Sequence, residues 1–488
     1  MSLDDVLYLL CLLTSIAIGP YFCKLKNDSE KKLYGTILGV LVVFIVSGFH
    51  ILHCFISFAL CAAAILCLHP CQSHVVSFFI MFGYLAFFRI TSVFGIPSPP
   101  GPTNMVQMIL TLKLAGVAFE KNTAYNNILQ RNKDLSAKTS EKTDNNEKKD
   151  VESKPIIELT EYDMELQNIN VSDLFHYCFN YIGILTGPYY RYRTYRDYFE
   201  TPFSHHADSK SATIEKLKWC ATYGIIHVIA GYFWPLSYVL EAEFYEQRSL
   251  LYRFFYIWPT FLIFRMRIYT GLILGESVCT SASFGAYPDE SDVAKGEGPR
   301  KQYLHLKRDC EKRTYNFDTI KNIDVYYVET GPMFRETLRN WNICVQYWLA
   351  MNVYKRFPSK KYRTVVTLLT SAFWHGFYPG HYLCIMGGPF YVPIEDIHHK
   401  LWRKDATGLK RKVIDIMFLF SKFFALSYLG MAFVLLTFKE IWHYYSSVYH
   451  LGYIYYFILV ITGLLAAKQK KQTEKAEKPR NDTEKKVE

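Results

Sequence analysis

Residues 365–383 read VVTLLTSAFWHGFYPGHYL and set one histidine, His375, inside an apolar run that is otherwise unbroken. An imidazole at membrane depth loses its hydration and needs a hydrogen-bonding partner, so ionisable groups in membrane segments are usually functional. A second interpretation stands beside the first, in which His375 is a buried or interfacial residue satisfied by its neighbours. The apolar pattern alone leaves both interpretations open.

Long apolar runs dominate the rest of the chain. Hydrophobic residues make up 50% of it, aromatic residues 17% and charged residues 20%. A helix needs about 20 apolar residues to cross the hydrocarbon core of a bilayer. Eight runs come near this length: Val6–Cys23, Leu33–Gly48, Ile51–Leu68, Val75–Phe94, Trp219–Leu240, Leu250–Leu274, Val413–Phe438 and Leu451–Ala467. The sequence therefore predicts an all-α, polytopic membrane protein.

Four further apolar runs are shorter or interrupted: Met105–Phe119, Leu174–Tyr190, Ile343–Val353 and Val365–Leu383. Helices this short are tolerated in a membrane only when they pack inside protein or line a wet cavity. We therefore expect the short runs to be central and the long runs peripheral, in a single domain over residues 1–467. Counting both kinds predicts about eleven transmembrane helices, with the short or broken ones around a substrate tunnel.

Basic loops indicate which side of the membrane is cytosolic. The stretch Lys24–Lys32, KLKNDSEKK, holds four lysines, and short loops rich in Lys and Arg stay in the cytosol. The N-terminus is then expected in the lumen, and its acidic start lacks the basic region of a cleavable signal peptide. The basic segment Glu395–Lys404 is expected in the cytosol for the same reason.

Three polar segments are expected outside the membrane. Gln130–Lys154 has almost no large apolar residues, which predicts a disordered linker. Gly275–Arg335 has mixed charge and predicts an extramembrane segment. Residues 468–488 predict a charged cytosolic tail, and Lys485–Glu488 match the dilysine pattern that returns membrane proteins to the endoplasmic reticulum. We therefore expect a multi-pass protein of that membrane.

Cysteine usage and net charge give no sign of a disulfide-rich protein, a zinc protein or a nucleic-acid-binding protein. The 12 cysteines lie mostly in apolar runs without a CxxC pair, which favours buried thiols over disulfides or a zinc site. The net charge of +11 is spread around helix ends, where Lys and Arg anchor to anionic headgroups. Membrane lipids are therefore the expected partners, and no nucleic acid is needed to explain the charge.

An arginine cluster follows the apolar run Leu174–Tyr190. In LTGPYYRYRTYRDYF (185–199), Arg191, Arg193 and Arg196 alternate with tyrosines. Arginines and aromatic residues at a helix end are ordinary anchors in the membrane interface. Guanidinium groups also match phosphate oxygens, so Arg191 and Arg193 are candidate ligands for a lipid headgroup or nucleotide phosphate. Both interpretations can hold together.

Two amides lie on the apolar run that follows Trp341. Asn342 and Gln346 are four residues apart and are predicted to share one face of a helix. An amide on an apolar helix usually stabilises contacts with other helices by hydrogen bonding. A catalytic or substrate-binding role is the alternative at both positions.

Four segments together resemble one family. WNICVQYWLAMNVYK (341–355) and SAFWHGFYPGHYL (371–383) resemble the two signature segments of the membrane-bound O-acyltransferases. LTGPYYRYRTYRDYF (185–199) and FGIPSPPGPTNMVQMILTLKL (94–114) are most similar to the lysophosphatidylinositol acyltransferase branch. The resemblance extends from the first apolar run to about Ala467 and is strongest in the WN and WHG motifs.

This resemblance implies a reaction and a site. His375 would be the general base and Asn342 its assisting partner, in transfer of a fatty acyl group from acyl-CoA to the sn-2 hydroxyl of a lysophospholipid. Lysophosphatidylinositol is the implied acceptor, and polyunsaturated chains such as arachidonoyl the implied donors. Trp374 would help to wall the acyl chain, and Gln346 is a further candidate for substrate binding. Neither a metal nor a resident cofactor is expected, and acyl-CoA is a co-substrate.

Three alternatives remain at this point. A sister activity would acylate another lysophospholipid. A di-iron membrane oxidase would need histidines grouped tightly enough to hold two metals, whereas those of this chain occur as pairs on separate segments. A transporter would agree with the short, broken helices, but the two halves show no repeat. The oligomeric state stays open.

Overall fold

The computed structural model describes residues 3–143 and 161–477. Within them nearly all regular structure is helical, and each of the four strands is two residues long. Seven helical stretches in the described residues are long and apolar enough to cross a membrane. The predicted all-α, multi-pass fold is therefore confirmed.

Each of the eight long apolar runs overlaps one of the seven stretches, because Asp28–Cys67 covers most or all of two of them. The predicted total of about eleven transmembrane helices stays a prediction for the shorter elements. The stretches are Leu3–Cys23 (α1), Asp28–Cys67 (α2, Asp28–Ser47, and α3, Ile51–Cys67), Pro70–Arg89 (α4), Ser209–Leu240 (with α10, Ser209–Phe233), Leu250–Ser281 (α12, Leu250–Phe255, and α13, Ile257–Ser281), Gly408–Leu435 (α19) and Leu451–Thr473 (in α21, Leu451–Glu477).

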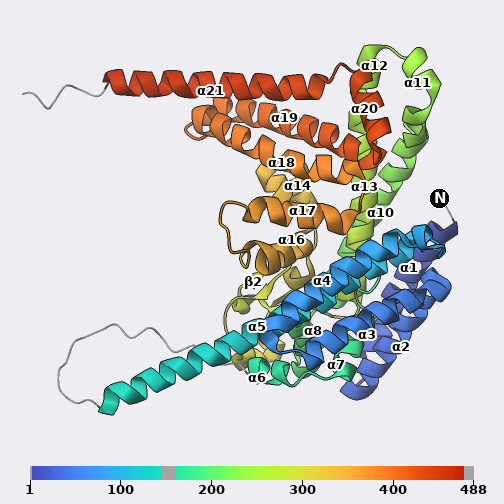
Figure 1. Ribbon diagram of the computed structural model, residues 1–488, viewed down its shortest axis with the longest axis vertical. Helices are drawn as coiled ribbons and strands as arrows, with labels where there is room; N and C mark the ends of the chain where they lie inside the picture. The colour runs from blue at the N-terminus through green and yellow to red at the C-terminus, as the bar shows by residue number, and fades with distance from the viewer. Residues whose placement is uncertain (1–2, 144–160, 478–488) are drawn as a thin grey trace, which may run out of the picture. The chain divides into compact units, whose positions relative to one another are not determined.

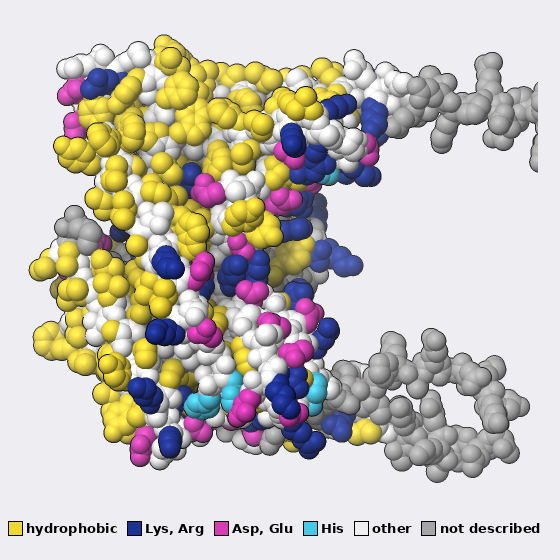
Figure 2. All heavy atoms as spheres, turned by 180° about the vertical axis from the view of Figure 1, so that it is seen from behind, with side chains coloured by type: hydrophobic (Ala, Val, Ile, Leu, Met, Phe, Trp, Pro, Cys, Tyr) yellow, Lys and Arg dark blue, Asp and Glu magenta, His cyan; other side chains and the backbone are white. Residues whose placement is uncertain are grey.

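Two of these stretches keep most of their apolar surface open. Only 11% of the apolar windows in Ser209–Leu240 and Leu451–Thr473 is buried, against 50% in Gly408–Leu435. Hydrophobic side chains also spread over wide areas of the molecular face in Figure 2. Apolar helix surface of this extent fits contact with lipid, as expected of peripheral long helices.

The chain forms two compact units. The first unit comprises Met1–Ala221, Thr270–Ile323 and Asn342–Arg363, and the second comprises Thr222–Tyr269, Asp324–Trp341 and Thr364–Glu488. Besides α1–α4, the first unit contains α5 (Gly101–Thr143), α6 (Glu161–Gln167), α7 (Val171–Phe179), α8 (Tyr192–Glu200), α9 (Phe203–His206), the strands β1 (Tyr287–Pro288), β2 (Val293–Ala294), β3 (Gly298–Pro299) and β4 (Tyr315–Asn316), and α16 (Ile343–Leu349).

Helix α5 is the centre of the first unit. It packs along α4, as Figure 1 shows, and its apolar half around Lys113 is almost completely buried. The Lys113 ammonium donates to the carbonyl of Tyr177 at 3.1 Å and to the hydroxyl of Tyr190 at 2.9 Å. The indole N–H of Trp348 donates to the carbonyl of Leu112 at 2.9 Å. The run Met105–Phe119 is thus a core element of this unit.

A small polar lobe in the first unit lies within the predicted extramembrane segment. Strand β1 pairs with β4 and β2 pairs with β3, both antiparallel. A buried cluster in this lobe includes Phe203, Tyr287 of β1 and Tyr303. The predicted segment Gly275–Arg335 therefore contains short paired strands, although its first residues still belong to α13.

The second unit is built around α18 (Pro379–His398), which packs against α19 and α21 (Figure 1). Gly380 allows the close approach to α19, because a Cβ there would lie 2.0 Å from the carbonyl oxygen of Ala432. The second unit also contains α11 (Ala242–Glu246), α12, α14 (Val325–Thr330), α15 (Phe334–Arg339), α17 (Arg363–His375, which begins in the first unit), α20 (Phe438–Ser447) and parts of α10 and α13.

Buried charges tie α14 into the second unit. Arg265 donates through two nitrogens to the Glu329 carboxylate, at 3.0 and 3.2 Å, and the Tyr269 hydroxyl donates to the same group at 2.6 Å. Lys422 of α19 is fully buried and donates to the carbonyls of Val328 and Gly331, each at 2.8 Å. The last carbonyls of α14 thus find a partner in a cation, which suits the negative end of a helix.

Three predicted segments differ from the structure. The first part of the predicted linker, 130–143, continues α5 as helix, and Gln130 donates to Asp134 one turn later at 2.9 Å; residues 144–154 lie outside the described residues. Helix α21 likewise continues into the predicted tail as far as Glu477, whereas Lys485–Glu488 lie outside the described part. The run Leu174–Tyr190 is helical only to Phe179, and its remainder is buried without regular structure.

Candidate active site

His375 is the last residue of α17, so the predicted apolar run is broken at the histidine itself. Gly376 follows with φ +158°, a conformation that favours glycine, and α18 begins only at Pro379. We call residues His375–Pro379 the histidine turn. Proline at the start of a helix is favourable because its missing N–H needs no partner there. The imidazole therefore lies at the break between α17 and α18, in a run that was expected to be short or interrupted.

Aromatic rings surround the His375 imidazole. Its centroid lies 4.9 Å from that of Trp374, 5.4 Å from Phe433 and 6.2 Å from His381. Trp374 is only 6% exposed, whereas His375 is half-buried. The structure therefore brings His375 together with predicted Trp374, in surroundings that are largely apolar and that leave the imidazole partly accessible.

His381 is a neighbour that the sequence reasoning did not include in the site. Its ring lies against Gly376, where an added Cβ would stand 2.8 Å from Cε1 and 2.9 Å from Nδ1. Phe433 contacts the same ring, with centroids 4.6 Å apart. The sequence did contain a signal for this neighbour, because His381 lies in the same signature segment as His375, six positions later. The absence of a side chain at Gly376 lets the His381 ring lie against the histidine turn.

Asn342 does not lie within a helix, contrary to the expected helical face. It is the N-cap of α16, with φ 52° and ψ 50°, in the left-handed region. Asparagine is among the few residues that adopt this region readily. Its backbone carbonyl accepts a hydrogen bond from the backbone N–H of Gln346 at 3.0 Å. Asn342 and Gln346 are therefore linked through the backbone across one helical turn. We call residues Asn342–Cys344 the asparagine turn.

The predicted site residues divide between the two units. Asn342, Gln346, Arg191 and Arg193 belong to the first unit, and His375 and Trp374 belong to the second. Within the first unit the structure places Gln346 one helical turn after Asn342. Each catalytic candidate therefore has its own local geometry.

Arg191 and Arg193 already have acceptors within the protein. The Nε of Arg191 lies 3.6 Å from a Glu120 oxygen, and the other Glu120 oxygen accepts the backbone N–H of Tyr192 at 3.1 Å. Arg193 donates to the hydroxyl of Tyr303 at 3.0 Å. Both contacts hold α8 in place. A role in phosphate binding stays a prediction for these two residues.

A buried carboxylate lies next to Arg193. Asp197 accepts hydrogen bonds from the hydroxyls of Tyr287 and Tyr303, and this cluster joins α8 to the strand lobe outside the candidate spans. Burial raises the pKa of the Asp197 carboxyl above its usual value, because loss of hydration outweighs the hydrogen bonds and the charge of Arg193. The Tyr303 hydroxyl thus links Arg193 to a carboxyl whose pKa is raised by burial.

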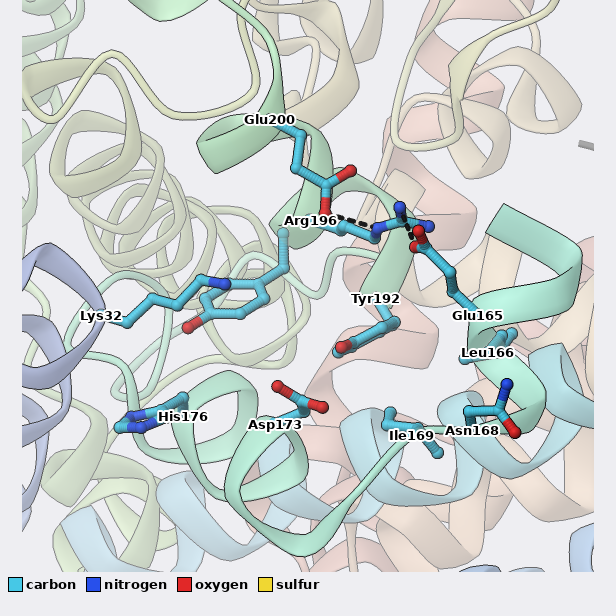
Figure 3. A pocket seen from close by; sticks show the side chains of 11 residues that line it. Lys32, Glu165, Leu166, Asn168, Ile169, Asp173, His176, Tyr192, Arg196 and Glu200 are labelled. Atoms are coloured by element: carbon cyan, nitrogen blue, oxygen red, sulfur yellow. Dashed lines mark hydrogen bonds and ion pairs between the residues drawn. The ribbon is translucent and has the colours of Figure 1, made fainter. Parts of the chain in front are cut away.

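The third arginine of the cluster lines a polar pocket of about 290 Å³ in the first unit. Figure 3 shows Arg196 held between Glu165 and Glu200, while Lys32 and His176 project from the opposite side. None of the predicted catalytic or substrate-binding residues lines this pocket. Arg196 is thus paired with two carboxylates of the pocket, whose lining comes from α2, α6, α7 and α8.

Histidine, cysteine and carboxylate side chains do not converge on a metal position in the described ranges. Within residues 3–143 and 161–477, no group of three or more such side chains lies close enough to hold an ion. His50 and His53 stack with their ring centroids 6.0 Å apart, but they form only a pair. The grouping that a di-iron site requires is not formed by these residues.

Comparison with known proteins identifies similar chains over nearly their whole length. The model of the membrane-bound O-acyltransferase family matches residues 100–438. A membrane-bound acylglycerophosphatidylinositol O-acyltransferase of Drosophila melanogaster is 56% identical over 475 residues, covering 97% of this chain and 95% of the relative. Proteins of the same name from Xenopus laevis and Homo sapiens are 34% and 33% identical, covering 100% and 95% of this chain and 98% and 94% of their own.

Proposed function

Because the chain belongs to the membrane-bound O-acyltransferase family, we propose that it transfers a fatty acyl group from acyl-CoA to the sn-2 hydroxyl of lysophosphatidylinositol. The family predicted from the two signature segments and the branch predicted from residues 94–114 and 185–199 are confirmed by these matches. Support for the acceptor comes from relatives named as acylglycerophosphatidylinositol acyltransferases. The observation in the structure that carries the proposal is the partly accessible His375 at the end of α17, among aromatic rings.

His375 acts as the general base in this proposal. A lipid hydroxyl is a weak nucleophile at neutral pH and needs a base within hydrogen-bonding distance. The imidazole takes the hydroxyl proton as the oxygen attacks the thioester carbonyl, and the new ester bond forms as the carbon–sulfur bond breaks. The proton then passes to the leaving coenzyme A sulfur, which restores the neutral imidazole. No residue is acylated, and the balance requires neither a metal nor a redox cofactor.

Asn342 assists the transfer through its amide. The carbonyl oxygen of the thioester gains negative charge in the transition state, and a fixed hydrogen-bond donor there lowers the barrier. An amide at the N-cap of α16, held in the left-handed conformation, has a defined direction that a residue on a mobile loop lacks. Gln346, one turn later, is proposed to contact substrate, together with Trp374 along the acyl chain.

The cellular setting is part of the proposal. We place the protein in the endoplasmic reticulum membrane with the lysine-rich loop Lys24–Lys32 in the cytosol, supported by the positive-inside rule. Acyl-CoA, which is anionic and soluble, then approaches from the cytosol, and the lysolipid arrives through the bilayer. Arg191 and Arg193 are proposed as phosphate ligands on substrate entry. Polyunsaturated chains such as arachidonoyl are the proposed preferred donors.

Product analysis with purified protein tests the reaction and both specificities together. The full chain, in detergent micelles, receives an equimolar mixture of lysophospholipids with different headgroups and a mixture of acyl-CoAs, and products are identified by mass spectrometry. We expect phosphatidylinositol with a polyunsaturated acyl chain to dominate. A product with another headgroup would reassign the acceptor, and absence of any acylated lipid would reject the proposed function.

A further inference from the structure

The asparagine turn leaves two backbone donors that its own helix does not satisfy. The first N–H groups of any helix have no partner within the helix. In this turn they belong to Ile343 and Cys344, whose residues are 9% and 0% exposed. Buried N–H groups without acceptors are costly, so the acceptors they find determine whether Asn342 keeps its left-handed conformation.

A single residue, Asn322, accepts both donors. Its backbone carbonyl accepts the N–H of Ile343 at 2.6 Å, and its side-chain oxygen accepts the N–H of Cys344 at 3.2 Å. Asn322 is itself only 3% exposed, so water does not compete freely for these bonds. The two contacts fix the backbone immediately after Asn342 from one side.

A buried carboxylate in turn fixes Asn322. One oxygen of Glu276, on α13, accepts the backbone N–H groups of Asn322 at 2.7 Å and of Ile323 at 3.1 Å. The other oxygen forms an ion pair with Lys216 of α10. Glu276 is 1% exposed, and a buried charge that is both paired and hydrogen-bonded holds its partners rigidly.

A glycine closes the turn from another direction. Gly296 has φ +68°, and a Cβ there would stand 3.0 Å from the backbone nitrogen of Cys344 and 3.1 Å from its Cα. Its own N–H donates to the carbonyl of Asp318 at 2.9 Å, which holds the loop in place. The asparagine turn is thus confined between Asn322 and Gly296, with little room to shift.

We propose that Glu276 and Asn322 are positioning residues for the acyl transfer, which direct the Asn342 amide by fixing the backbone of the asparagine turn. This proposal depends on the role assigned to Asn342 in the proposed function. Glu276 holds Asn322, Asn322 holds Ile343 and Cys344, and those two residues set the angle at which Asn342 leaves the helix. All of these residues lie in the first unit.

Steady-state kinetics of Glu276→Ala, Glu276→Gln and Asn322→Ala in the full chain tests the first step. Since the residues act on geometry and touch no substrate, kcat should fall about tenfold or more in both alanine variants while KM for acyl-CoA and lysolipid stays close to wild type. Glu276→Gln keeps an oxygen for the two N–H groups and should lose clearly less. Equal losses in Glu276→Gln and Glu276→Ala, or a rise in KM with unchanged kcat, would overturn the proposal.

Combination with Asn342→Ala tests whether the effect passes through Asn342. Once the amide is gone, its direction no longer matters, so adding Glu276→Ala or Asn322→Ala should lower kcat by less than about twofold. Losses that multiply would overturn the positioning role. Full activity of Asn342→Ala alone would instead reject the proposed role of Asn342, which separates the two failures.

Gly296→Ala changes the same turn without removing a buried charge. It therefore tests the proposal even if the Glu276 variants do not accumulate. The added methyl should push on Cys344 and lower kcat severalfold with KM retained. Gly83→Ala is the matched control, because a Cβ at Gly83 meets nothing within 4 Å. Equal activity of Gly296→Ala and Gly83→Ala would show that the turn does not need its present geometry and would overturn the proposal.

Discussion

The two turns that carry the candidate catalytic residues are held by different kinds of contact. The asparagine turn is fixed by hydrogen bonds that lead back to a buried ion pair between Glu276 and Lys216. The histidine turn is packed by rings, with Trp374 and Phe433 against the imidazole. Hydrogen bonds are directional, whereas ring packing is tolerant of small rotations. We therefore expect loss of a hydrogen-bonding group to disturb the asparagine turn, and an added methyl group between the rings to disturb the histidine turn.

Replacement of His375 should give the largest effect. We expect His375→Ala to reduce acyl transfer by at least about a hundredfold, because the hydroxyl then lacks its base. The measurement is product formation per mole of purified protein, with accumulation in membranes checked in parallel. His206→Ala, the same change at an exposed histidine outside the signature segments, should behave as wild type. Full activity of His375→Ala would remove the imidazole from the mechanism.

Changes at Asn342 separate the amide from its backbone. Asn342→Ala should lower kcat at least about tenfold through loss of a polar transition-state contact. Asn342→Gly should lose a similar amount, even though glycine adopts the left-handed conformation without strain. Both rates come from the same product assay. If the glycine variant kept the wild-type rate, the position would matter only for its backbone.

An added methyl in the histidine turn tests how much freedom ring packing allows. Gly376→Ala places a Cβ 2.8 Å from Cε1 of His381, and alanine is strained at this φ. We expect kcat to fall by about tenfold, because the imidazole of His375 moves with the turn. Gly83→Ala serves again as the control. An unchanged rate would show the histidine turn to be even more tolerant than its contacts indicate.

The smallest effect is expected at the buried Asp197 carboxylate, which accepts hydrogen bonds from Tyr287 and Tyr303 outside the candidate spans. Because burial raises the pKa of Asp197, the folded chain holds this proton more tightly than the unfolded chain does. The resulting stabilisation is complete below the unfolded pKa and is lost as pH rises through the folded one. The melting temperature of wild type should therefore fall by a few degrees relative to Asp197→Asn between about pH 4 and about pH 7.

The control for this pH effect is Asp405→Asn, which removes an exposed carboxylate. Its melting temperature should follow that of wild type at every pH. If the melting temperatures of wild type and Asp197→Asn changed with pH in the same way, protonation of Asp197 would not stabilise the fold.

Long apolar runs could be predicted from the sequence because membrane crossing depends on length and composition, which are local properties. Val6–Cys23, for example, lies within α1, and Val413–Phe438 covers most of α19 and ends at the first residue of α20. The family and the candidate residues His375 and Asn342 also followed from short signature segments. These features do not depend on which distant residues come together.

The turns themselves could not be predicted, because distant residues shape them. Asn342 leaves the helical conformation where Asn322 and Gly296 confine the next residues. Likewise Arg191 is paired with Glu120, more than seventy positions earlier, and Arg193 with Tyr303, more than a hundred positions later. Spacing within one segment cannot reveal such partners. The continuation of α5 into the first part of the expected linker, residues 130–143, was missed because its polar composition suits a solvated helix as well as a disordered chain.

The buried ammonium of Lys422 has a consequence for how the chain is made. The carbonyls of Val328 and Gly331 that it satisfies are synthesised some ninety residues before it. Until α19 emerges from the ribosome and enters the bilayer, these carbonyls at the end of α14 must accept hydrogen bonds from water or another donor. The final fold of the second unit is therefore completed late in biogenesis, when a lysine on one of its last helices displaces that temporary solvent.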